Sequence, residues 1–249
     1  MPLLRDFGHL RFRAPVTFFV GENGSGKSTL LEALAAASGA YAIGRAAIES
    51  DQTLRPAREL ASALTLQRGL RPKTKAFLSA EDVFGFTQRV AQDMADLKTV
   101  ESELLADSEA SATARRRAAS QIGAQRGALA RRYGSDPDAG SHGETFLALL
   151  NERLVPHGLY FLDEPETPLS PTRILALIAL LSRATADGSQ FLIATHSPIL
   201  MALPTAEILE FSGDRIAPVA YDDVEHVRVT RDFLNRPEAF LRRLADDAE

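Results

Sequence analysis

Short apolar runs alternate with helix-like stretches along most of the chain. Four runs of four or five residues, rich in aliphatic and aromatic side chains, predict buried strands. They lie at 16–20, 75–79, 159–162 and 190–194. Leu- and Ala-rich segments at 28–37, 143–154 and 171–186 predict helices, the last with Pro171 in its first turn. Buried strands that alternate with helices predict an α/β fold with a mostly parallel sheet, flanked by helices on both faces.

The middle of the chain has a different pattern. Residues 82–133 carry few prolines or glycines and no strand signal, which predicts two or more helices that end in the Gly- and Pro-containing loop 134–140. We therefore expect one domain over residues 1–249, with a helical subdomain inserted at 82–154.

Three further elements are expected outside that subdomain. One short helix is expected within 44–73. Apolar runs at 208–211 and 216–219 flank Gly213-Asp214 and predict a late hairpin. The stretch 231–245 predicts one helix near the C-terminus.

Composition narrows the class of protein. The 249 residues are 45% hydrophobic, which is enough for a substantial core, and the absence of cysteine excludes disulfides and thiolate metal sites. No run reaches the roughly 18 apolar residues of a membrane span, and the charged N-terminus lacks the apolar core of a signal peptide. We expect a cytoplasmic protein without membrane insertion of its own. The net charge of −5 argues weakly against a protein that coats DNA.

A phosphate-binding loop follows the first predicted strand. Residues 21–28, GENGSGKS, match the pattern G-x-x-x-x-G-K-[ST] and lead into a predicted helix. Glycines let backbone N–H groups surround phosphate oxygens, Lys27 would contact the β- and γ-phosphates, and Ser28 would ligate Mg²⁺. The expected nucleotide-binding residues are Gly21, Glu22, Asn23, Gly24, Ser25, Gly26, Lys27, Ser28 and Thr29.

Two carboxylates follow the strand at 159–162. Asp163, at the carboxyl end of that strand, would reach the Mg²⁺ ion, and Glu164 would accept a proton from the attacking water. Beside a phosphate loop, this pair indicates ATP hydrolysis. Glu166, two residues further, is expected to be a loop residue with a possible charge role.

Together with two further segments, these motifs resemble those of ATP-binding-cassette ATPases. The phosphate loop, Ser141-His-Gly-Glu144, the acidic pair and Ala194-Thr-His196-Ser-Pro stand in that family's order, with 22 residues from Ser141 to Asp163 and 32 from Glu164 to His196. In detail the chain is similar to small stand-alone bacterial "AAA family" ATPases, distant relatives of SMC and RecF proteins. Ser141-His-Gly-Glu144 is the segment that corresponds to the family's signature motif. It departs from the Leu-Ser-Gly-Gly-Gln signature of transporter cassettes.

That resemblance implies a function and a set of roles. It implies Mg²⁺-dependent ATP hydrolysis in an ATP-dependent homodimer, with two nucleotides held between head-to-tail subunits. Ser141 and Gly143 would touch the γ-phosphate bound by the other subunit, and Glu144 belongs to the same nucleotide-binding set. His196 would sense the γ-phosphate, and Leu169 and Ser170 would lie in the loop that crosses between the sites.

Two positions leave alternatives open. The family places a glutamine after the strand that precedes the helical subdomain, where this chain has Phe77-Leu-Ser-Ala-Glu81; Glu81 would then be a Mg²⁺ ligand, or Gln88 serves instead, or Glu81 starts a helix. Phe7 and Phe12 are candidates for stacking on adenine, although such aromatics are more often core. His9, His157 and His226 have no motif around them and are expected to be ordinary surface or turn residues.

The target of the ATPase is open between two classes. One is a conformational switch in nucleic-acid metabolism or defence; the other is an ATPase subunit coupled to a separately encoded membrane or protein partner. Residues 112–132 hold six arginines and no acid, after an acidic stretch at 101–109. These arginines either pair with the acidic stretch on an adjacent antiparallel helix or form a surface for nucleic-acid phosphates. They are Arg115, Arg116, Arg117, Arg126, Arg131 and Arg132.

Overall fold

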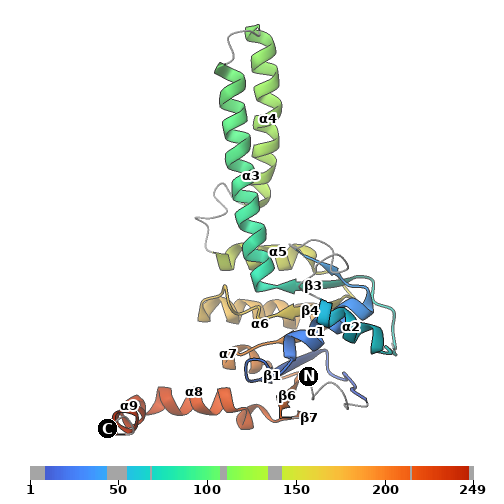
Figure 1. The fold of residues 1–249 in the computed structure, drawn as a ribbon, viewed down its shortest axis with the longest axis vertical. Helices are drawn as coiled ribbons and strands as arrows, with labels where there is room; N and C mark the ends of the chain where they lie inside the picture. The colour runs from blue at the N-terminus through green and yellow to red at the C-terminus, as the bar shows by residue number, and fades with distance from the viewer. Residues whose placement is uncertain are drawn as a thin grey trace. The chain divides into compact units, whose positions relative to one another are not determined.

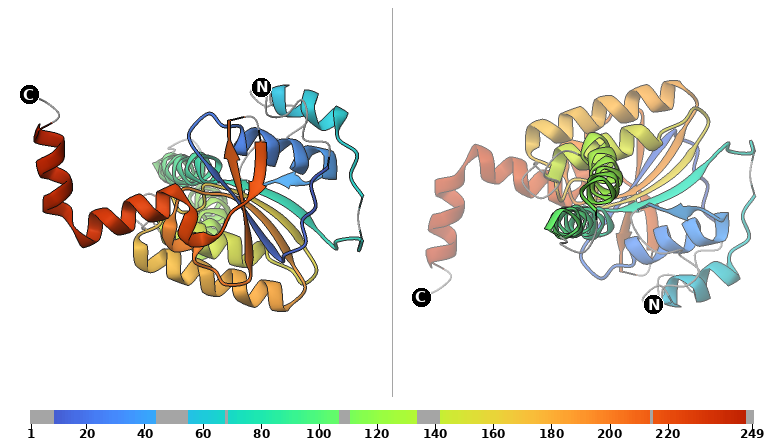
Figure 2. Two further views of the ribbon diagram at one scale, coloured as in Figure 1. Left: turned by 90° about the horizontal axis from the view of Figure 1, so that it is seen from below. Right: turned by 90° about the horizontal axis from the view of Figure 1, so that it is seen from above.

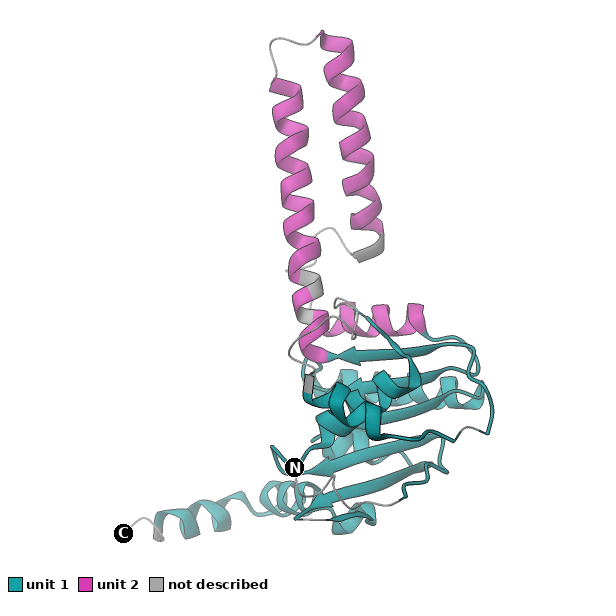
Figure 3. Cartoon of the chain, turned by 45° about the vertical axis from the view of Figure 1, so that its right-hand side comes forward, with its two compact units in different colours: residues 1–79, 154–249 teal, residues 80–153 magenta. Residues whose placement is uncertain are grey.

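The chain forms two compact units in a computed structural model. Unit 1 comprises Met1–Ser79 and Leu154–Glu249, and unit 2 comprises Ala80–Arg153 (Figure 3). The structure describes residues 9–43, 55–67, 69–106, 111–133, 142–213 and 215–246.

Unit 1 is built on a seven-stranded sheet with the strand order β2-β3-β4-β5-β1-β6-β7. All neighbouring strands run parallel except β7, which is antiparallel to β6. The strands are β1 (Val16–Gly21), β2 (Tyr41–Ala42), β3 (Lys75–Ser79), β4 (Leu159–Asp163), β5 (Gln190–Ala194), β6 (Ala206–Ser212) and β7 (Arg215–Pro218). The predicted α/β fold with a mostly parallel sheet is confirmed, as is the late hairpin, whose turn contains Gly213 at a φ of 60°.

Helices cover both faces of this sheet, which is why the central strands β1, β4 and β5 are mostly apolar. Helix α1 (Lys27–Ser38) and helix α6 (Pro171–Ala186) lie on opposite faces (Figure 2). In the core beside α1, Leu30, Leu31 and Leu34 pack with aromatic side chains of the strands. From α6, Ile174, Leu177 and Leu181 are buried. Two short elements complete this part, α2 (Arg55–Ala63) and α7 (Pro198–Met201).

The C-terminal part of unit 1 differs from the expectation of one helix at 231–245. A 3₁₀ turn, η3 (Tyr221–Asp223), precedes α8 (Glu225–Asn235), and a separate helix α9 (Pro237–Asp246) follows. Arg236 interrupts the helix with a φ of −143° and a ψ of 55°. The break has a local cause, because the ring of Pro237 disfavours helical geometry at the preceding residue.

Unit 2 is helical in all its described residues except Ser111, which precedes α4. Helices α3 (Ala80–Ala106) and α4 (Ala112–Tyr133) run antiparallel as a long hairpin, and α5 (His142–Arg153) follows (Figure 1). The prediction of two or more helices in 82–133 is confirmed. Val90 and Met94 of α3 and Ala119 of α4 are buried in this unit. Across all described residues, no helix has both the length and the apolar character needed to cross a membrane.

Candidate functional site

The loop between β1 and α1 has a backbone that requires its glycines. Gly21, Gly24 and Gly26 have φ angles of 136°, 79° and 98°, a region that residues with a Cβ rarely adopt. At Gly21 a Cβ atom would also lie 2.4 Å from the carbonyl oxygen of Phe211. The loop therefore curls tightly at the carboxyl end of β1, directly before the N-terminus of α1.

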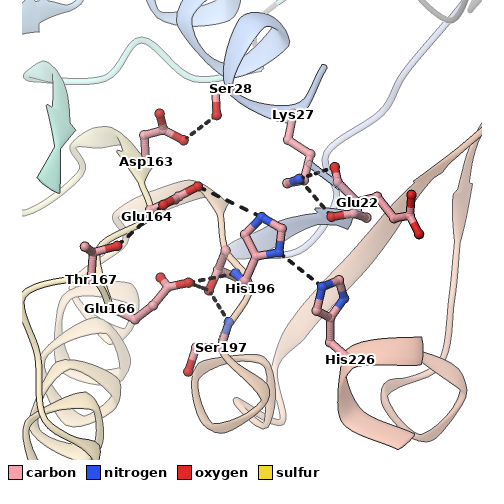
Figure 4. Close-up of polar contacts among 12 residues, drawn as sticks. Glu22, Lys27, Ser28, Asp163, Glu164, Glu166, Thr167, His196, Ser197 and His226 are labelled. Atoms are coloured by element: carbon pink, nitrogen blue, oxygen red, sulfur yellow. Dashed lines mark hydrogen bonds and ion pairs between the residues drawn. The ribbon is translucent and has the colours of Figure 1, made fainter. Parts of the chain in front are cut away.

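Lys27 holds this loop together from the first position of α1. Its Nζ donates hydrogen bonds to the carbonyl oxygens of Gly21 and Glu22, each at 2.8 Å (Figure 4). The side chain is buried, and burial lowers the pKa of Lys27, while the carboxylates of Glu164 and Asp163 oppose that shift. A buried cation near two acidic side chains is a suitable partner for a polyanion such as a nucleoside triphosphate.

Ser28 and Asp163 meet although they are 135 positions apart in the sequence. The Ser28 hydroxyl donates to Asp163 Oδ1 at 2.9 Å. Ser28 lies in the first turn of α1, and Asp163 ends β4, so the parallel sheet brings them to one edge. A hydroxyl beside a carboxylate is an oxygen donor pair of the kind that Mg²⁺ prefers.

Glu164 follows Asp163 in a left-handed conformation, with a φ of 47°. Its backbone N–H donates to the carbonyl oxygen of Ala194 at 2.9 Å, which ties the residue to the end of β5. The carboxylate remains about half exposed, with Oε1 3.9 Å from His196 Nε2. A non-glycine residue in this region costs about 1–3 kcal/mol, and such strain is concentrated at functional sites.

Glu166 is more than the loop residue expected from the sequence. Its Oε1 accepts hydrogen bonds from Thr195 Oγ1 and from the backbone N–H of His196, both at 2.7 Å. Its other oxygen, Oε2, is buried without a hydrogen-bond partner among the described residues. Burial raises the pKa of Glu166, and the two hydrogen bonds oppose that rise. Glu166 therefore fixes the loop after β5 to the loop after β4.

His196 lies at the centre of these contacts. Its Nε2 is directed toward Glu164 and, among the described residues, has no hydrogen-bond partner although the atom is buried. Burial lowers the pKa of His196, and the positive charge of Lys27 and the neighbouring His226 lower it further, while Glu164 opposes them. The imidazole is therefore neutral near pH 7.

His226 corrects the expectation that it is an ordinary surface or turn residue. It lies in the first turn of α8, is half-buried, and places Nε2 3.2 Å from His196 Nδ1. The two rings are 5.0 Å apart between centroids at an interplanar angle of 68°. No local sequence pattern marks His226, because only the packing of α8 brings it to this site. His157, in contrast, is exposed in a turn as expected.

The remaining predicted residues fall into three groups. In the loop, the Ser25 hydroxyl is buried without a hydrogen-bond partner among the described residues, and Glu22 and Asn23 are exposed. Glu81, Gly143 and Glu144 belong to unit 2, the first at the start of α3 and the others in the first turn of α5. Ser141 lies outside the described residues, as does Phe7.

Phe12, one candidate for stacking on adenine, is partly buried. It packs against the hydrophobic core, with its ring centroid 6.0 Å from that of Phe19. Leu169 is also buried, and Ser170 precedes the first residue of α6. At the position where the cassette family has a glutamine, Glu81 lies in the first turn of α3, as in the alternative that it starts a helix. Glu81 and Gln88 are both exposed, so exposure does not decide which of them would face a metal ion.

Fold and loop together define the class of protein. A mostly parallel sheet whose first strand leads through GENGSGKS into a helix is the fold of P-loop NTPases. Within that class, two family models match the chain. One, described as "AAA domain", matches residues 4–57; the other, described as "AAA domain, putative AbiEii toxin, Type IV TA system", matches residues 145–202.

The two matched segments contain the residues described above. The first includes the phosphate loop, and the second includes Asp163, Glu164, Glu166 and His196. Each segment is less than a quarter of the chain, and residues 58–144 lie outside both. Both descriptions agree with a P-loop ATPase domain. No curated protein sequence matches this chain.

Solved structures with a similar fold include an ATP-binding subunit and SMC head domains. An ATP-binding subunit of an ABC transporter is 19% identical, with 84% of this chain and 79% of that chain covered and a TM-score of 0.38. The SMC head domain from Thermotoga maritima is 16% identical, with 82% and 90% covered and a TM-score of 0.39. The Smc head domain from Pyrococcus furiosus, bound to the C-terminal domain of ScpA, is 11% identical, with 87% and 92% covered and a TM-score of 0.37. At this degree of likeness, none of them carries an argument about function.

Proposed function

We propose that this chain binds ATP with Mg²⁺ and hydrolyses it to ADP and phosphate. The observation that carries the proposal is the Ser28–Asp163 hydrogen bond of 2.9 Å beside the buried ammonium of Lys27. It joins a candidate metal-binding pair to a phosphate-binding loop in one chain.

The residues present fit the nucleotide and its metal. The loop backbone and Lys27 would hold the phosphates, with the buried Ser25 hydroxyl as a further polar group in the loop. Ser28 and Asp163 would hold Mg²⁺, which supplies charge neutralisation for the phosphates. Gly21 to Thr29 form the nucleotide-binding segment of the proposal.

Glu164 is the proposed general base. Its backbone is fixed to Ala194 in a left-handed conformation, and its carboxylate is exposed enough to receive a water molecule. It would accept the proton of the attacking water. The neutral His196 would contact the γ-phosphate through Nε2 and so orient it for attack. The buried Nε2 atom, unpartnered among the described residues, supports that role for His196.

The signature segment extends the proposal to a dimer. Gly143 and Glu144 lie in the first turn of α5, and Ser141 directly precedes that helix in sequence. Following the resemblance to cassette ATPases, we propose that residues 82–154 act as a helical subdomain whose signature completes the site of a second subunit. ATP would then drive homodimerisation, and hydrolysis would release it, which makes the chain a conformational switch.

Replacement of Glu164 tests the chemical step. Glu164→Gln should retain ATP binding but hydrolyse ATP about 100-fold more slowly or worse, which is the usual contribution of a general base. Turnover is measured by phosphate release and affinity by calorimetry. Glu238→Gln, which removes an exposed carboxylate on α9, is the matched control and should leave turnover unchanged. Wild-type turnover in a clean Glu164→Gln preparation would contradict the proposal.

A further inference from the structure

The contact between His196 and His226 constrains where their protons lie. Two imidazole nitrogens 3.2 Å apart share one hydrogen bond only if one nitrogen carries a proton and the other does not. Either His196 Nδ1–H donates to His226 Nε2, or His226 Nε2–H donates to His196 Nδ1. In a neutral imidazole, the choice at Nδ1 also decides whether Nε2 carries a proton.

The surroundings of His196 favour the second arrangement. Its Nε2 is directed at the Glu164 carboxylate, with 3.9 Å between Nε2 and Oε1 (Figure 4). A carboxylate can only accept hydrogen bonds, so the electrostatic field of Glu164 favours a proton on Nε2. His196 is neutral, since burial, Lys27 and His226 lower its pKa, and its Nδ1 is then left as an acceptor.

The packing of the C-terminal segment holds His226 in place for this bond. Val224 and Val227, on either side of His226 in sequence, are buried at 1% and 2% relative exposure. The Tyr221 hydroxyl donates to the carbonyl oxygen of Pro198 at 3.1 Å, which ties η3 to the start of α7. The segment that carries His226 is thus fixed to the loop that carries His196.

We propose that His226 is a positioning residue that donates its Nε2–H to His196 Nδ1 and so fixes His196 as the Nε2–H tautomer. This inference rests on the proposed function for the role of His196, but the tautomer itself does not depend on ATP. Helix α8 then has a part in the site, because it sets which nitrogen of His196 carries the proton that faces Glu164.

The tautomer is measured on the nucleotide-free protein, by long-range ¹H–¹⁵N correlation of the histidine rings near pH 7.5. The wild-type protein should show His196 with Nε2 protonated and Nδ1 unprotonated, and His226 with Nε2 protonated. A spectrum with His196 protonated at Nδ1 would overturn the proposal without any variant having to fold.

Two substitutions separate the hydrogen bond from packing. His226→Phe keeps an aromatic ring but has no donor, so His196 should become a mixture of tautomers. His226→Gln has an amide N–H that can donate to Nδ1, so it should restore the wild-type spectrum. Thr230→Ala, at an exposed position one turn later on α8, is the control and should change nothing. A wild-type His196 spectrum in His226→Phe would contradict the proposal.

Turnover gives a second and separate readout. His226→Phe should lower kcat for ATP about tenfold, the smaller end of what removal of an orienting partner costs a functional histidine, with little change in KM. His226→Gln should recover most of that loss. If the spectra are as expected but Glu164→Gln keeps full turnover, the proposed hydrolysis mechanism is wrong and the tautomer assignment stands. If the wild-type protein hydrolyses ATP but its His196 is a mixture of tautomers, only the tautomer assignment is wrong.

Discussion

The candidate nucleotide site of unit 1 and the signature segment of unit 2 differ in what positions their residues. The nucleotide site comprises the phosphate loop, Asp163, Glu164 and His196; the signature segment is 141–144. In unit 1, sheet register aligns the strand ends that carry chemistry: Asp163 pairs with Ala194, and Ala194 pairs with Phe19 of β1, shortly before the loop. In unit 2, the first turn of helix α5 positions Gly143 and Glu144. Residues 134–141, which precede this helix, lie outside the described part of the chain. In the proposed function, the residues for nucleotide binding, metal ligation and base chemistry that lie in unit 1 come from one chain, whereas the signature acts in the site of a second copy.

A substitution in the phosphate loop should therefore weaken ATP binding, whereas one in the signature segment should prevent dimerisation. These are the largest effects that we expect. Lys27→Ala should weaken ATP binding by roughly 10- to 100-fold, because it removes charge-assisted hydrogen bonds to the phosphates. Ser141→Arg, in a Glu164→Gln background, should keep ATP affinity but run as a monomer in light scattering with ATP and Mg²⁺, where Glu164→Gln alone runs as a dimer.

Lys73→Ala is the control for loss of a positive charge, because Lys73 is exposed in unit 1 away from the loop sequence. It should bind ATP as the wild-type protein does. Unchanged affinity in Lys27→Ala would contradict the phosphate-loop assignment. A monomeric Glu164→Gln protein with ATP would contradict the homodimer while leaving the phosphate loop untouched.

The nucleotide site of unit 1 was also the part of the molecule that the sequence predicted most completely. Its glycines need positive φ angles, and its strands are buried on both faces, so the local pattern specifies both the loop and the strand that precedes it. The positions of Asp163 and His196 follow from the same logic, since each comes directly at or after the end of a buried parallel strand. In such cases the local sequence alone determines which edge of the sheet a side chain reaches.

Glu166 and His226 could not be assigned in this way. Glu166 contacts Thr195, which is 29 positions away, and the Asp-Glu-Pro-Glu run only signals that a second carboxylate is present. His226 contacts His196 through the packing of a C-terminal helix whose start and end were themselves misplaced, since Pro237 splits the expected helix. Both contacts are tertiary and leave no periodic or spacing signal.

The next prediction concerns stability rather than chemistry. Glu166→Ala removes the acceptor for Thr195 Oγ1 and for the His196 N–H, and leaving such donors unpaired costs about 1–3 kcal/mol. Glu166→Gln keeps a carbonyl acceptor and should therefore melt at a higher temperature than Glu166→Ala. Thermal unfolding of the nucleotide-free protein measures both, with Glu225→Ala, an exposed carboxylate on α8, as control.

The melting temperatures of the wild-type protein and of Glu166→Gln should depend differently on pH. Because the pKa of Glu166 is raised above its ordinary value of 4.5, the folded protein binds this proton more tightly than the unfolded chain does. Wild-type stability from this group then falls as pH rises above 4.5, and no such loss exists in Glu166→Gln. The difference in melting temperature, Gln variant minus wild type, should grow as pH rises above 4.5 and level off once pH exceeds the raised pKa of Glu166 in the folded protein. A difference that shrinks as pH rises above 4.5 would contradict the assigned direction of the pKa shift.

The smallest effect is expected in the helical hairpin, where the arginines divide into two kinds. Arg126 Nη2 lies 3.1 Å from Glu101 Oε2, so for this residue pairing with the acidic stretch on the antiparallel helix is observed. Both side chains are partly exposed, and such a pair contributes about 0.2–1 kcal/mol. Arg126→Ala should therefore lower the melting temperature slightly and leave any nucleic-acid affinity unchanged.

Arg116 and Arg117 are exposed on the same helix and provide the contrasting test. If they contact nucleic-acid phosphates, replacing both with Ala should weaken binding of DNA or RNA and reduce the slope of affinity against salt, at unchanged melting temperature and basal ATPase rate. Fluorescence anisotropy at several salt concentrations measures this, with Arg126→Ala as the matched variant. Should the wild-type protein bind neither duplex nor single-stranded nucleic acid at low salt, with or without ATP, a surface for nucleic-acid phosphates on this hairpin is excluded.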